Sequence, residues 1–268
     1  MENKKRRYHY KSYVNSKRTK QLSLEKGLVG FLCTCNFKEK ECVKDAYKIL
    51  EKFYDESIKT SNDENKKQTK KTDLLKKESN DISDQLKNEI DALHKGTEKS
   101  VVNKIFQHID TGVKNVIFIK STIPDPLKLT LTIIKTITET NTPISRFLLR
   151  FLPIQTICRA NIDEIKSEAN LLFEKHFVQT PVTFAIVFNR HYNNTIQRQA
   201  VIEALASIIT SKNPGNKADL KNPDIAVVVE IIKNSCLLSI APEYYKYKKY
   251  NLLELCNKKD LTTNENVE

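Results

Sequence analysis

The sequence predicts an α+β fold built in two parts. Short apolar runs that are typical of buried strands alternate with segments whose apolar residues recur every three or four positions, as in amphipathic helices. This alternation begins again after Pro153. The chain has 268 residues, which is enough for one large domain or two small ones with an ordinary core.

The first part is expected to contain three strands and two helices. Asp125 can cap the second helix and Pro126 suits its first position, whereas Pro153 is expected to end the third strand. Helices on one face of a small sheet in this order resemble a ferredoxin-like unit. The predicted elements, in chain order, are strand 28–34, helix 40–53, strand 116–119, a helix from residue 126, and strand 146–152.

A polar insertion is expected inside the first part, at about residues 57–100. This segment contains no Phe, Tyr or Trp and is rich in Lys, Asp, Glu, Asn and Ser, so it cannot form a core of its own. Apolar residues at helical spacing between Leu74 and Leu93 indicate a solvated helix within it.

The second part repeats the alternation with more apolar strands. The run at 226–232 is the most apolar in the chain, which favours a central strand covered on both faces. Asp163 and Glu164 fit the N-terminus of a helix better than a catalytic pair, because adjacent residues on a helix point apart. The elements are predicted as helix 162–177, strand 182–188, helix 197–209, turn 213–216, and strands 226–232 and 236–241.

The charge distribution indicates a polyanionic partner, with nucleic acid the leading class. The chain has 45 basic and 33 acidic residues, a net charge of +12. The first twenty residues contain eight basic residues and one acidic residue, Glu2, so they carry +7 of this net charge. We expect disordered tails at residues 1–24 and 256–268, and either an RNA contact, a nuclear localisation signal or a merely solubilising role for Lys4, Lys5, Arg6 and Arg7.

Several functional classes are disfavoured by what the sequence lacks. It has five glycines and none of the glycine-rich loops that cradle nucleotide phosphates, so we predict no cofactor and no catalytic residues. Cys33, Cys35 and Cys42 lack the turn of a zinc knuckle, and the five histidines lack metal-binding spacing, so no metal site is expected either. No apolar run approaches the ~18 residues of a membrane span, and none resembles a secretory signal.

Residues 146–242 resemble the THUMP domain, an RNA-binding module of tRNA-modifying proteins. The resemblance lies in R-F-L-P-I at 150–154, the strand 184–188 followed by Arg190, and A-D-L-K-N-P-D at 218–224 leading into V-V-V-E-I at 227–231. Beyond this domain, most of residues 25–255 resembles the stand-alone THUMP-domain adaptors of tRNA cytidine acetylation. The segments that carry this wider match are 27–36, 40–43, 115–120 and 247–252.

This resemblance implies an N-terminal ferredoxin-like domain at 25–145 followed by an α/β THUMP domain at 146–255. It also implies a non-catalytic adaptor that presents serine and leucine tRNAs to a separate RNA cytidine acetyltransferase, which forms N4-acetylcytidine in the D-arm. The THUMP domain would engage the acceptor end. We expect a nuclear protein, in the nucleolus in particular, with the cytoplasm left open.

We predict that cations at strand ends, turns and helix starts of the second part bind RNA. Long basic side chains at these places can reach phosphates without disturbing the core. An aromatic residue among them could stack on an unpaired base. The predicted RNA-binding residues are Arg150, Arg159, Arg190, Arg198, Lys217, Lys221, Asn222 and Tyr192.

Alternatives remain open at the level of the sequence. Arg150 could instead form an ion pair inside the sheet layer, since its neighbours Leu149 and Phe151 are apolar. The tyrosines and lysines of 244–250 could contact RNA, although packing on the domain is favoured because an apolar face continues beyond them. The chain as a whole could be a free-standing RNA-modifying enzyme or a structural RNA-binding protein of ribosome assembly.

Overall fold

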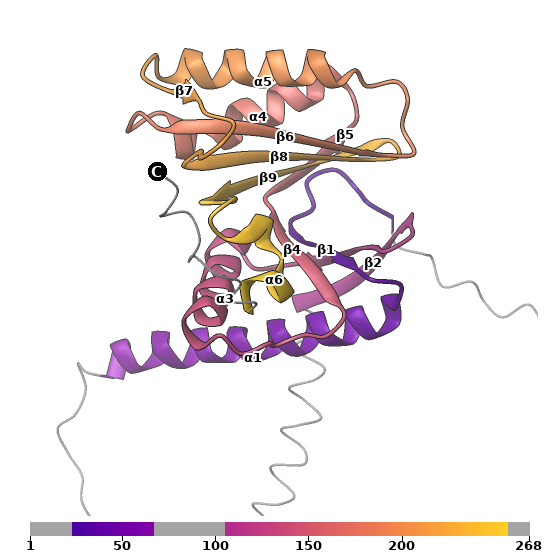
Figure 1. The fold of residues 1–268 in the computed structure, drawn as a ribbon, viewed down its shortest axis with the longest axis vertical. Helices are drawn as coiled ribbons and strands as arrows, with labels where there is room; N and C mark the ends of the chain where they lie inside the picture. Colours follow the sequence, from indigo (N-terminus) through magenta and orange to yellow (C-terminus); the bar gives the residue numbers. More distant parts are fainter. Residues whose placement is uncertain (1–22, 67–104, 257–268) are drawn as a thin grey trace, which may run out of the picture.

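The computed structural model describes residues 23–66 and 105–256 (Figure 1). The predictions made for the basic cluster at residues 4–7, for the helix at 74–93 and for the tail beyond Cys256 therefore lie outside the described residues.

The first part is a four-stranded antiparallel sheet with the order β2-β3-β1-β4. Helix α1 (Glu39–Lys66) follows β1, and α3 (Pro126–Thr140) connects β3 to β4. This β-α-β-β-α-β order is that of a ferredoxin-like unit, as predicted. The strands are β1 (Gly30–Cys35), β2 (Phe106–Val113), β3 (Val116–Ser121) and β4 (Leu148–Ile154).

Three details of this part differ from the prediction. Strand β2 was not predicted, because only one side of this edge strand carries a regular apolar pattern and polar residues interrupt it. Helix α1 continues to Lys66 instead of ending at Phe53. Strand β4 continues through Pro153 to Ile154, which proline permits because β4 is an edge strand where a missing N–H interrupts no second ladder.

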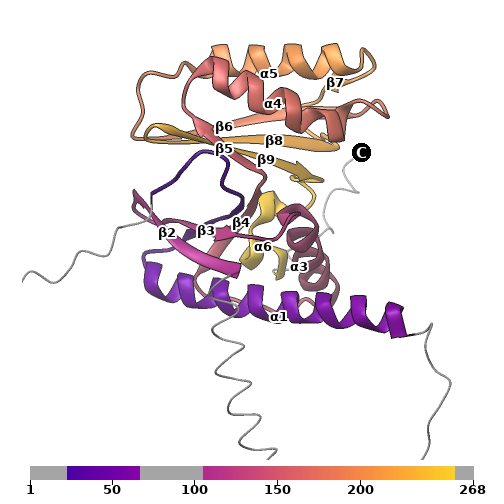
Figure 2. The ribbon, with the colours of Figure 1, turned by 180° about the vertical axis from the view of Figure 1, so that it is seen from behind.

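The second part is a five-stranded mixed sheet with the order β5-β9-β8-β6-β7, in which β6 is parallel to β7 and β8. Helices α4 (Ile162–Phe177) and α5 (Arg198–Lys212) cover one face of this sheet (Figures 1 and 2). The chain changes from the first sheet to the second between Ile154 and Thr156, later than the expected boundary at residue 146. The strands are β5 (Thr156–Arg159), β6 (Thr183–His191), β7 (Lys217–Ala218), β8 (Ile225–Ile232) and β9 (Ser235–Pro242).

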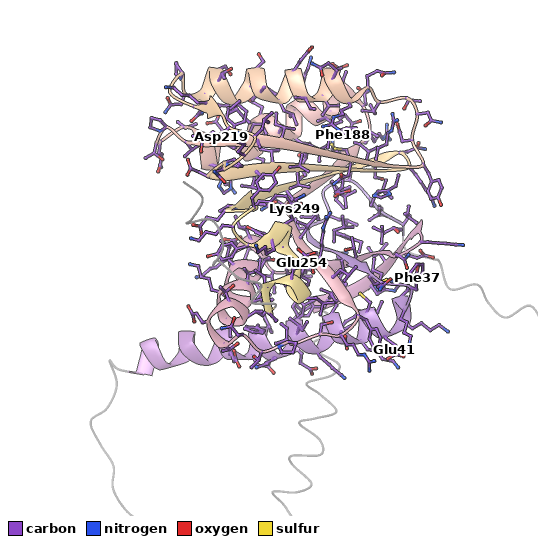
Figure 3. The ribbon with its side chains drawn as sticks, viewed as in Figure 1. Phe37, Glu41, Phe188, Asp219, Lys249 and Glu254 are labelled. Carbon is purple, nitrogen blue, oxygen red and sulfur yellow. The ribbon has the colours of Figure 1, made fainter. Side chains whose placement is uncertain are left out.

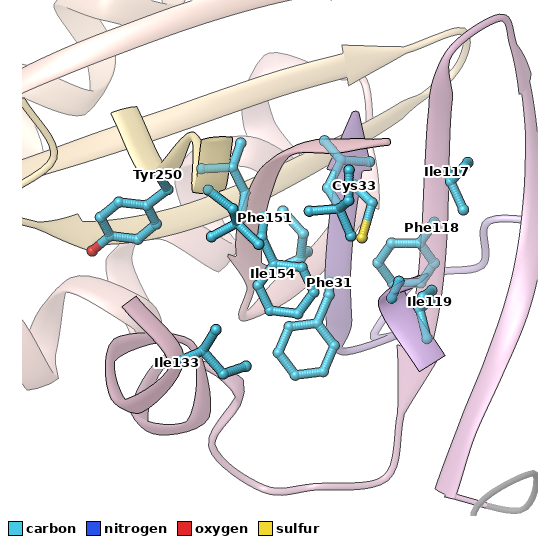
Figure 4. Packing of buried hydrophobic residues seen from close by; sticks show 14 of the residues in the cluster. Phe31, Cys33, Ile117, Phe118, Ile119, Ile133, Phe151, Ile154 and Tyr250 are labelled. Atoms are coloured by element: carbon cyan, nitrogen blue, oxygen red, sulfur yellow. The ribbon is translucent and has the colours of Figure 1, made fainter. Parts of the chain in front are cut away.

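Strand β8 is buried on both faces, which explains its continuous apolar sequence. Val227 and Val229 pack in the cluster beneath α4 and α5. Ala226 and Val228 point the other way, into a cluster shared with the first sheet. In that shared core the rings of Phe31 and Phe151 stack with centroids 4.9 Å apart (Figure 4). The two sheets are thus joined by a common hydrophobic core.

The tyrosines after β9 pack on the protein, as the favoured alternative predicted. Tyr244, Tyr247 and Tyr250 are buried, and the hydroxyl of Tyr250 donates a hydrogen bond to the Pro242 carbonyl at 2.7 Å. Burial raises the pKa of Tyr244 to about 12. The 3-10 helix η1 (Lys248–Tyr250) then packs on β4, and helix α6 (Leu252–Cys256) packs on both β4 and α3.

Candidate nucleic-acid interface

The strand register divides the predicted RNA-binding residues between opposite ends of the second sheet. His191 at the carboxyl end of β6 pairs with Ile232, which pairs with Ser235, which pairs with Arg159. The residues gathered at this end, here called the Arg190 end, are Arg159, Arg190, Tyr192 and Arg198. At the amino end of β6, Lys217 pairs with Thr183, and the residues of this Lys217 end are Lys217, Lys221 and Asn222.

Helices α4 and α5 both begin at the Arg190 end, but only one of them is capped. The Asn161 side chain accepts a hydrogen bond from the Asp163 N–H of α4, and acidic residues follow in its first turn. Gln197 at the start of α5 makes no side-chain cap, and the first turn of α5 contains no acidic residue. The N–H groups and dipole of α5 are therefore available to an anion, directly beside Arg198.

The loop between β6 and α5 is held in one conformation by hydrogen bonds. The Asn193 carboxamide oxygen accepts from the backbone N–H groups of Thr195 and Ile196, each at 3.0 Å. Arg190 Nη1 donates to the Ile196 carbonyl at 3.1 Å, so its guanidinium lies against the loop. Tyr192 is 73% exposed, so its ring is free to stack on a planar ligand.

Behind the loop, His191 and Asn189 share the buried Glu230 carboxylate. Asn189 Nδ2 donates to Glu230 Oε1 at 2.7 Å, and His191 Nε2 lies 3.6 Å from Glu230 Oε2. The hydrogen bond with Glu230 raises the pKa of His191 above its ordinary value, against the opposing effect of burial. His191 is thus protonated more readily than an ordinary histidine, and its protonated form can pair with the buried Glu230 carboxylate beneath the Arg190 end.

Arg159 is less suited to contact RNA than its neighbours at this end. Its side chain is exposed, but Arg159 Nε lies 4.0 Å from Glu164 Oε1. Lys26 also pairs with Glu164 and Glu168, at 3.3 and 3.6 Å. The two cations therefore share two nearby carboxylates, which reduces the field available to a phosphate.

The Lys217 end carries acidic residues alongside its cations. Asp219 Oδ1 accepts the backbone N–H groups of Lys221 and Asn222, at 2.8 and 3.0 Å, and these bonds hold the pKa of Asp219 below its ordinary value. Asp224 accepts from Thr183 and is likewise ionised more easily than usual, with a lowered pKa. A hollow of about 380 Å³ beside it is lined by Asn222, Pro223, Asp224, Glu243, Tyr245 and Lys246. Fixed carboxylates make this end less suited to phosphate than the Arg190 end.

Arg150 does not join either group. It lies in β4 of the first sheet, half-buried, where its backbone N–H donates to Thr34 Oγ1 at 3.1 Å and its backbone bridges to Asn251. No carboxylate among residues 23–66 and 105–256 lies within ion-pair distance of Arg150, so these residues offer no partner for the ion pair that the alternative expected. Its charge opposes the effect of burial on the pKa of the Tyr244 phenol.

The cysteines behave as small apolar residues. Cys33, Cys35 and Cys42 are buried, and burial raises the pKa of each thiol. Within residues 23–66 and 105–256 there is no cluster of three His, Cys, Asp or Glu side chains arranged to hold a metal ion. The same ranges contain no helix that is both long and apolar enough to cross a membrane.

Two features of the Arg190 end were missed from the sequence. The uncapped start of α5 could have been noticed, because Gln197 is a poor N-cap residue and no Asp or Glu follows it closely. Lys233, in the β8–β9 turn, donates its backbone N–H to the His191 carbonyl at 2.9 Å. Only the strand register brings Lys233 next to Tyr192, so no local pattern could have revealed it.

The second part of the chain matches the THUMP domain family over residues 159–241. The whole chain is 37% identical to "THUMP domain-containing protein 1 homolog" of Drosophila melanogaster, over 93% of this chain and 80% of that protein. It is 35% identical to human "THUMP domain-containing protein 1", over 91% and 70% of the two chains. Saccharomyces cerevisiae "tRNA acetyltransferase TAN1" is 27% identical over 88% and 87%. The chain belongs to the family of THUMP domain-containing protein 1.

Proposed function

We propose that this protein is a non-catalytic tRNA-binding adaptor, which presents tRNA to a separate RNA cytidine acetyltransferase. The observation that carries the proposal is the Arg190 end, where Arg190, Arg198 and the open N-terminus of α5 form a cationic site beside the exposed Tyr192 ring. Such a site suits RNA because backbone phosphates and unpaired bases can bind it together.

The name of one relative supports the link to acetylation. The yeast relative is named a tRNA acetyltransferase, and similarity to it extends over 88% of the present chain. The resemblance to stand-alone THUMP adaptors adds the finer expectation that the substrates are serine and leucine tRNAs, gripped at the acceptor end and acetylated in the D-arm.

Catalysis by this chain itself is the competing function, favoured by the name of the yeast relative. An acetyltransferase must hold the pyrophosphate of acetyl-CoA, commonly with backbone N–H groups of a glycine-rich turn. The sequence has five glycines and no such loop. A separate catalytic subunit fits these residues better.

A reconstituted reaction tests the proposal. Serine tRNA and acetyl-CoA are incubated with this chain, with the acetyltransferase, or with both, and acetyl transfer to RNA is measured. We expect transfer only when both proteins are present, and none to a tRNA other than serine or leucine tRNA. Acetylation by this chain alone would support the enzyme, and tighter binding of ribosomal RNA than of tRNA would support a role in ribosome assembly.

The proposal also assigns a role to the basic N-terminal segment. Lys4, Lys5, Arg6 and Arg7 would direct the protein to the nucleus, or to the nucleolus, or add an RNA contact. Replacing all four by glutamine and locating the protein in cells separates these roles, because a targeting signal would be lost even where tRNA affinity is unchanged.

A further inference from the structure

The two most exposed aromatic side chains among the described residues belong to different sheets. Phe37, in the β1–α1 loop, is 86% exposed, and Tyr192 is 73% exposed. Their φ angles are 62° and 52°, in the left-handed region that bulky residues rarely adopt. Neither ring contributes to the core, so folding provides no reason for either aromatic residue.

Each ring stands on a loop that an asparagine side chain organises. The Phe37 N–H donates to Asn115 Oδ1 at 3.1 Å, while the Asn115 N–H donates to Glu39 Oε1 at 2.7 Å. On the second sheet, Asn193 fixes the turn after Tyr192 and donates to the Lys233 carbonyl at 2.8 Å. Both rings are therefore presented by ordered backbone.

A chain of contacts connects the two loops. Asn115 lies in the β2–β3 turn, close to Gly112. A Cβ atom on Gly112 would overlap Lys233 Nζ, so the lysine side chain lies against that hairpin. Lys233 in turn bonds the His191 carbonyl next to Tyr192. Figure 1 shows the β2–β3 hairpin below the β8–β9 turn, and Figure 3 labels Phe37 on the same side of the molecule.

Positive charge occupies the space between the rings. Lys114 and Lys233 are exposed along this path, and Arg190 and Arg198 continue the charge beyond Tyr192. Lys38, beside Phe37, is exposed too, with its ammonium 5.1 Å from the centroid of the Phe147 ring. Two carboxylates lie along the same path, and the cations outnumber them: Glu39 accepts from the Asn115 N–H, and Asp110 accepts from the Gly112 N–H at 2.7 Å. We call this strip, from Phe37 through Lys114 and Lys233 to Tyr192, the aromatic edge.

We propose that the aromatic edge binds an unpaired segment of RNA, with Phe37 and Tyr192 each stacking on a base while the lysines between them contact phosphates. The proposal rests on the proposed function and adds the first sheet to the RNA-binding surface. Aromatic platforms separated by cations suit single-stranded nucleic acid, which offers π-faces and phosphates in alternation. An acidic peptide would use the lysines but would have no need of the rings.

Asparagine substitutions test the rings with little disturbance of the backbone, because asparagine tolerates the left-handed region better than other non-glycine residues. Phe37→Asn and Tyr192→Asn are each expected to weaken the binding of serine tRNA by about 5- to 150-fold. Leu220→Asn is the matched control, since Leu220 is 76% exposed at the Lys217 end, and it should leave affinity within about twofold.

A tryptophan reporter complements the loss of affinity. The sequence contains no tryptophan, so Phe37→Trp introduces a single tryptophan, whose emission can be excited apart from that of the ten tyrosines and whose ring can still stack. We expect tRNA to quench its emission and affinity to be retained. If Phe37→Asn keeps its affinity for tRNA and tRNA does not quench the emission of Phe37→Trp, RNA binding at the aromatic edge is wrong, but the proposed function is not affected. Failure of the wild-type chain to bind tRNA would overturn the proposed function as well.

Polyglutamate distinguishes the competing ligand. Oligoadenylate is expected to bind wild-type protein and to lose affinity in Phe37→Asn. If polyglutamate binds as tightly as oligoadenylate, and Phe37→Asn changes neither affinity, the edge is a site for acidic peptide and the proposal is wrong.

Discussion

Individual cations of the candidate interface differ in their surroundings, and this difference predicts unequal contributions to RNA binding. Arg198 lies at the open start of α5, whereas Lys221 follows Asp219, whose carboxylate accepts the Lys221 N–H. Arg198→Ala should therefore weaken tRNA binding and reduce the slope of log affinity against log salt by about one unit. Lys221→Ala should have a smaller effect. Equal losses in titrations at several salt concentrations would contradict the preference for the Arg190 end.

His191 predicts a pH-dependent contribution to stability. Its pKa is raised in the folded protein, mainly by the hydrogen bond with Glu230. The stabilisation is then complete below the unfolded pKa of about 6.5 and is lost as pH rises through the higher folded value. In urea unfolding, His191→Gln should therefore reduce the free energy of unfolding more at pH 5.5 than at pH 9. A difference that does not vary with pH would contradict this assignment.

The uncapped start of α5 predicts that stability and anion binding oppose each other at this element. Gln197 has φ −83° and ψ 124°, an extended conformation compatible with an N-cap. Gln197→Asp should supply the missing cap and stabilise the fold by about 1 kcal/mol. It should also weaken tRNA binding several-fold, because the carboxylate occupies the N–H groups and repels phosphate.

The capped helix α4 provides the matched control. Asn161→Ala removes the existing cap and should cost about 1 kcal/mol of stability while leaving the tRNA affinity of the folded protein unchanged. Thermal unfolding and tRNA titration of both variants check the pair. If Gln197→Asp bound tRNA as tightly as wild type, the start of α5 would not be a phosphate site.

The sequence predicts elements well where one physical signal dominates. The Asp125 cap begins α3 as expected, with its side chain accepting the Lys128 N–H at 3.1 Å, and the apolar run of β8 is a central strand. Strands β2, β5 and β7 were missed, because the first is polar on its outer side and the other two have four and two residues. Short edge strands depend on their partners more than on their own composition.

The candidate interface was predictable in residue type but not in arrangement. Basic and aromatic residues at strand ends indicated an RNA surface, yet nothing local separates Arg198 from Lys221. The parallel register of β6 with β7 and β8 puts them at opposite ends of a strand of nine residues. Phe37 was not predicted as a binding residue from the sequence, because its exposure depends on the turn that Asn115, 78 positions away, holds in place.

At the scale of the whole molecule, the N-terminal segment and the folded part should contribute separately to RNA binding. The first twenty residues contain eight basic residues and one acidic residue. Deleting them should make the salt dependence of tRNA binding shallower without abolishing binding, because the phosphate contacts proposed for the Arg190 end would remain. An unchanged slope would show that this segment does not contact RNA.

We propose that tRNA binding by this chain serves catalysis by another protein. The most direct measurement is the rate of tRNA acetylation by the acetyltransferase at increasing tRNA concentration, with either wild-type chain or the double variant Tyr192→Asn, Arg198→Ala. We expect the variant to raise the half-saturating tRNA concentration at least about tenfold, because one proposed stacking contact and one proposed phosphate contact are removed. The rate at saturating tRNA should be unchanged. An unchanged half-saturating concentration with a reduced maximal rate would contradict it, because these residues would then act in the chemical step instead of in presenting the tRNA.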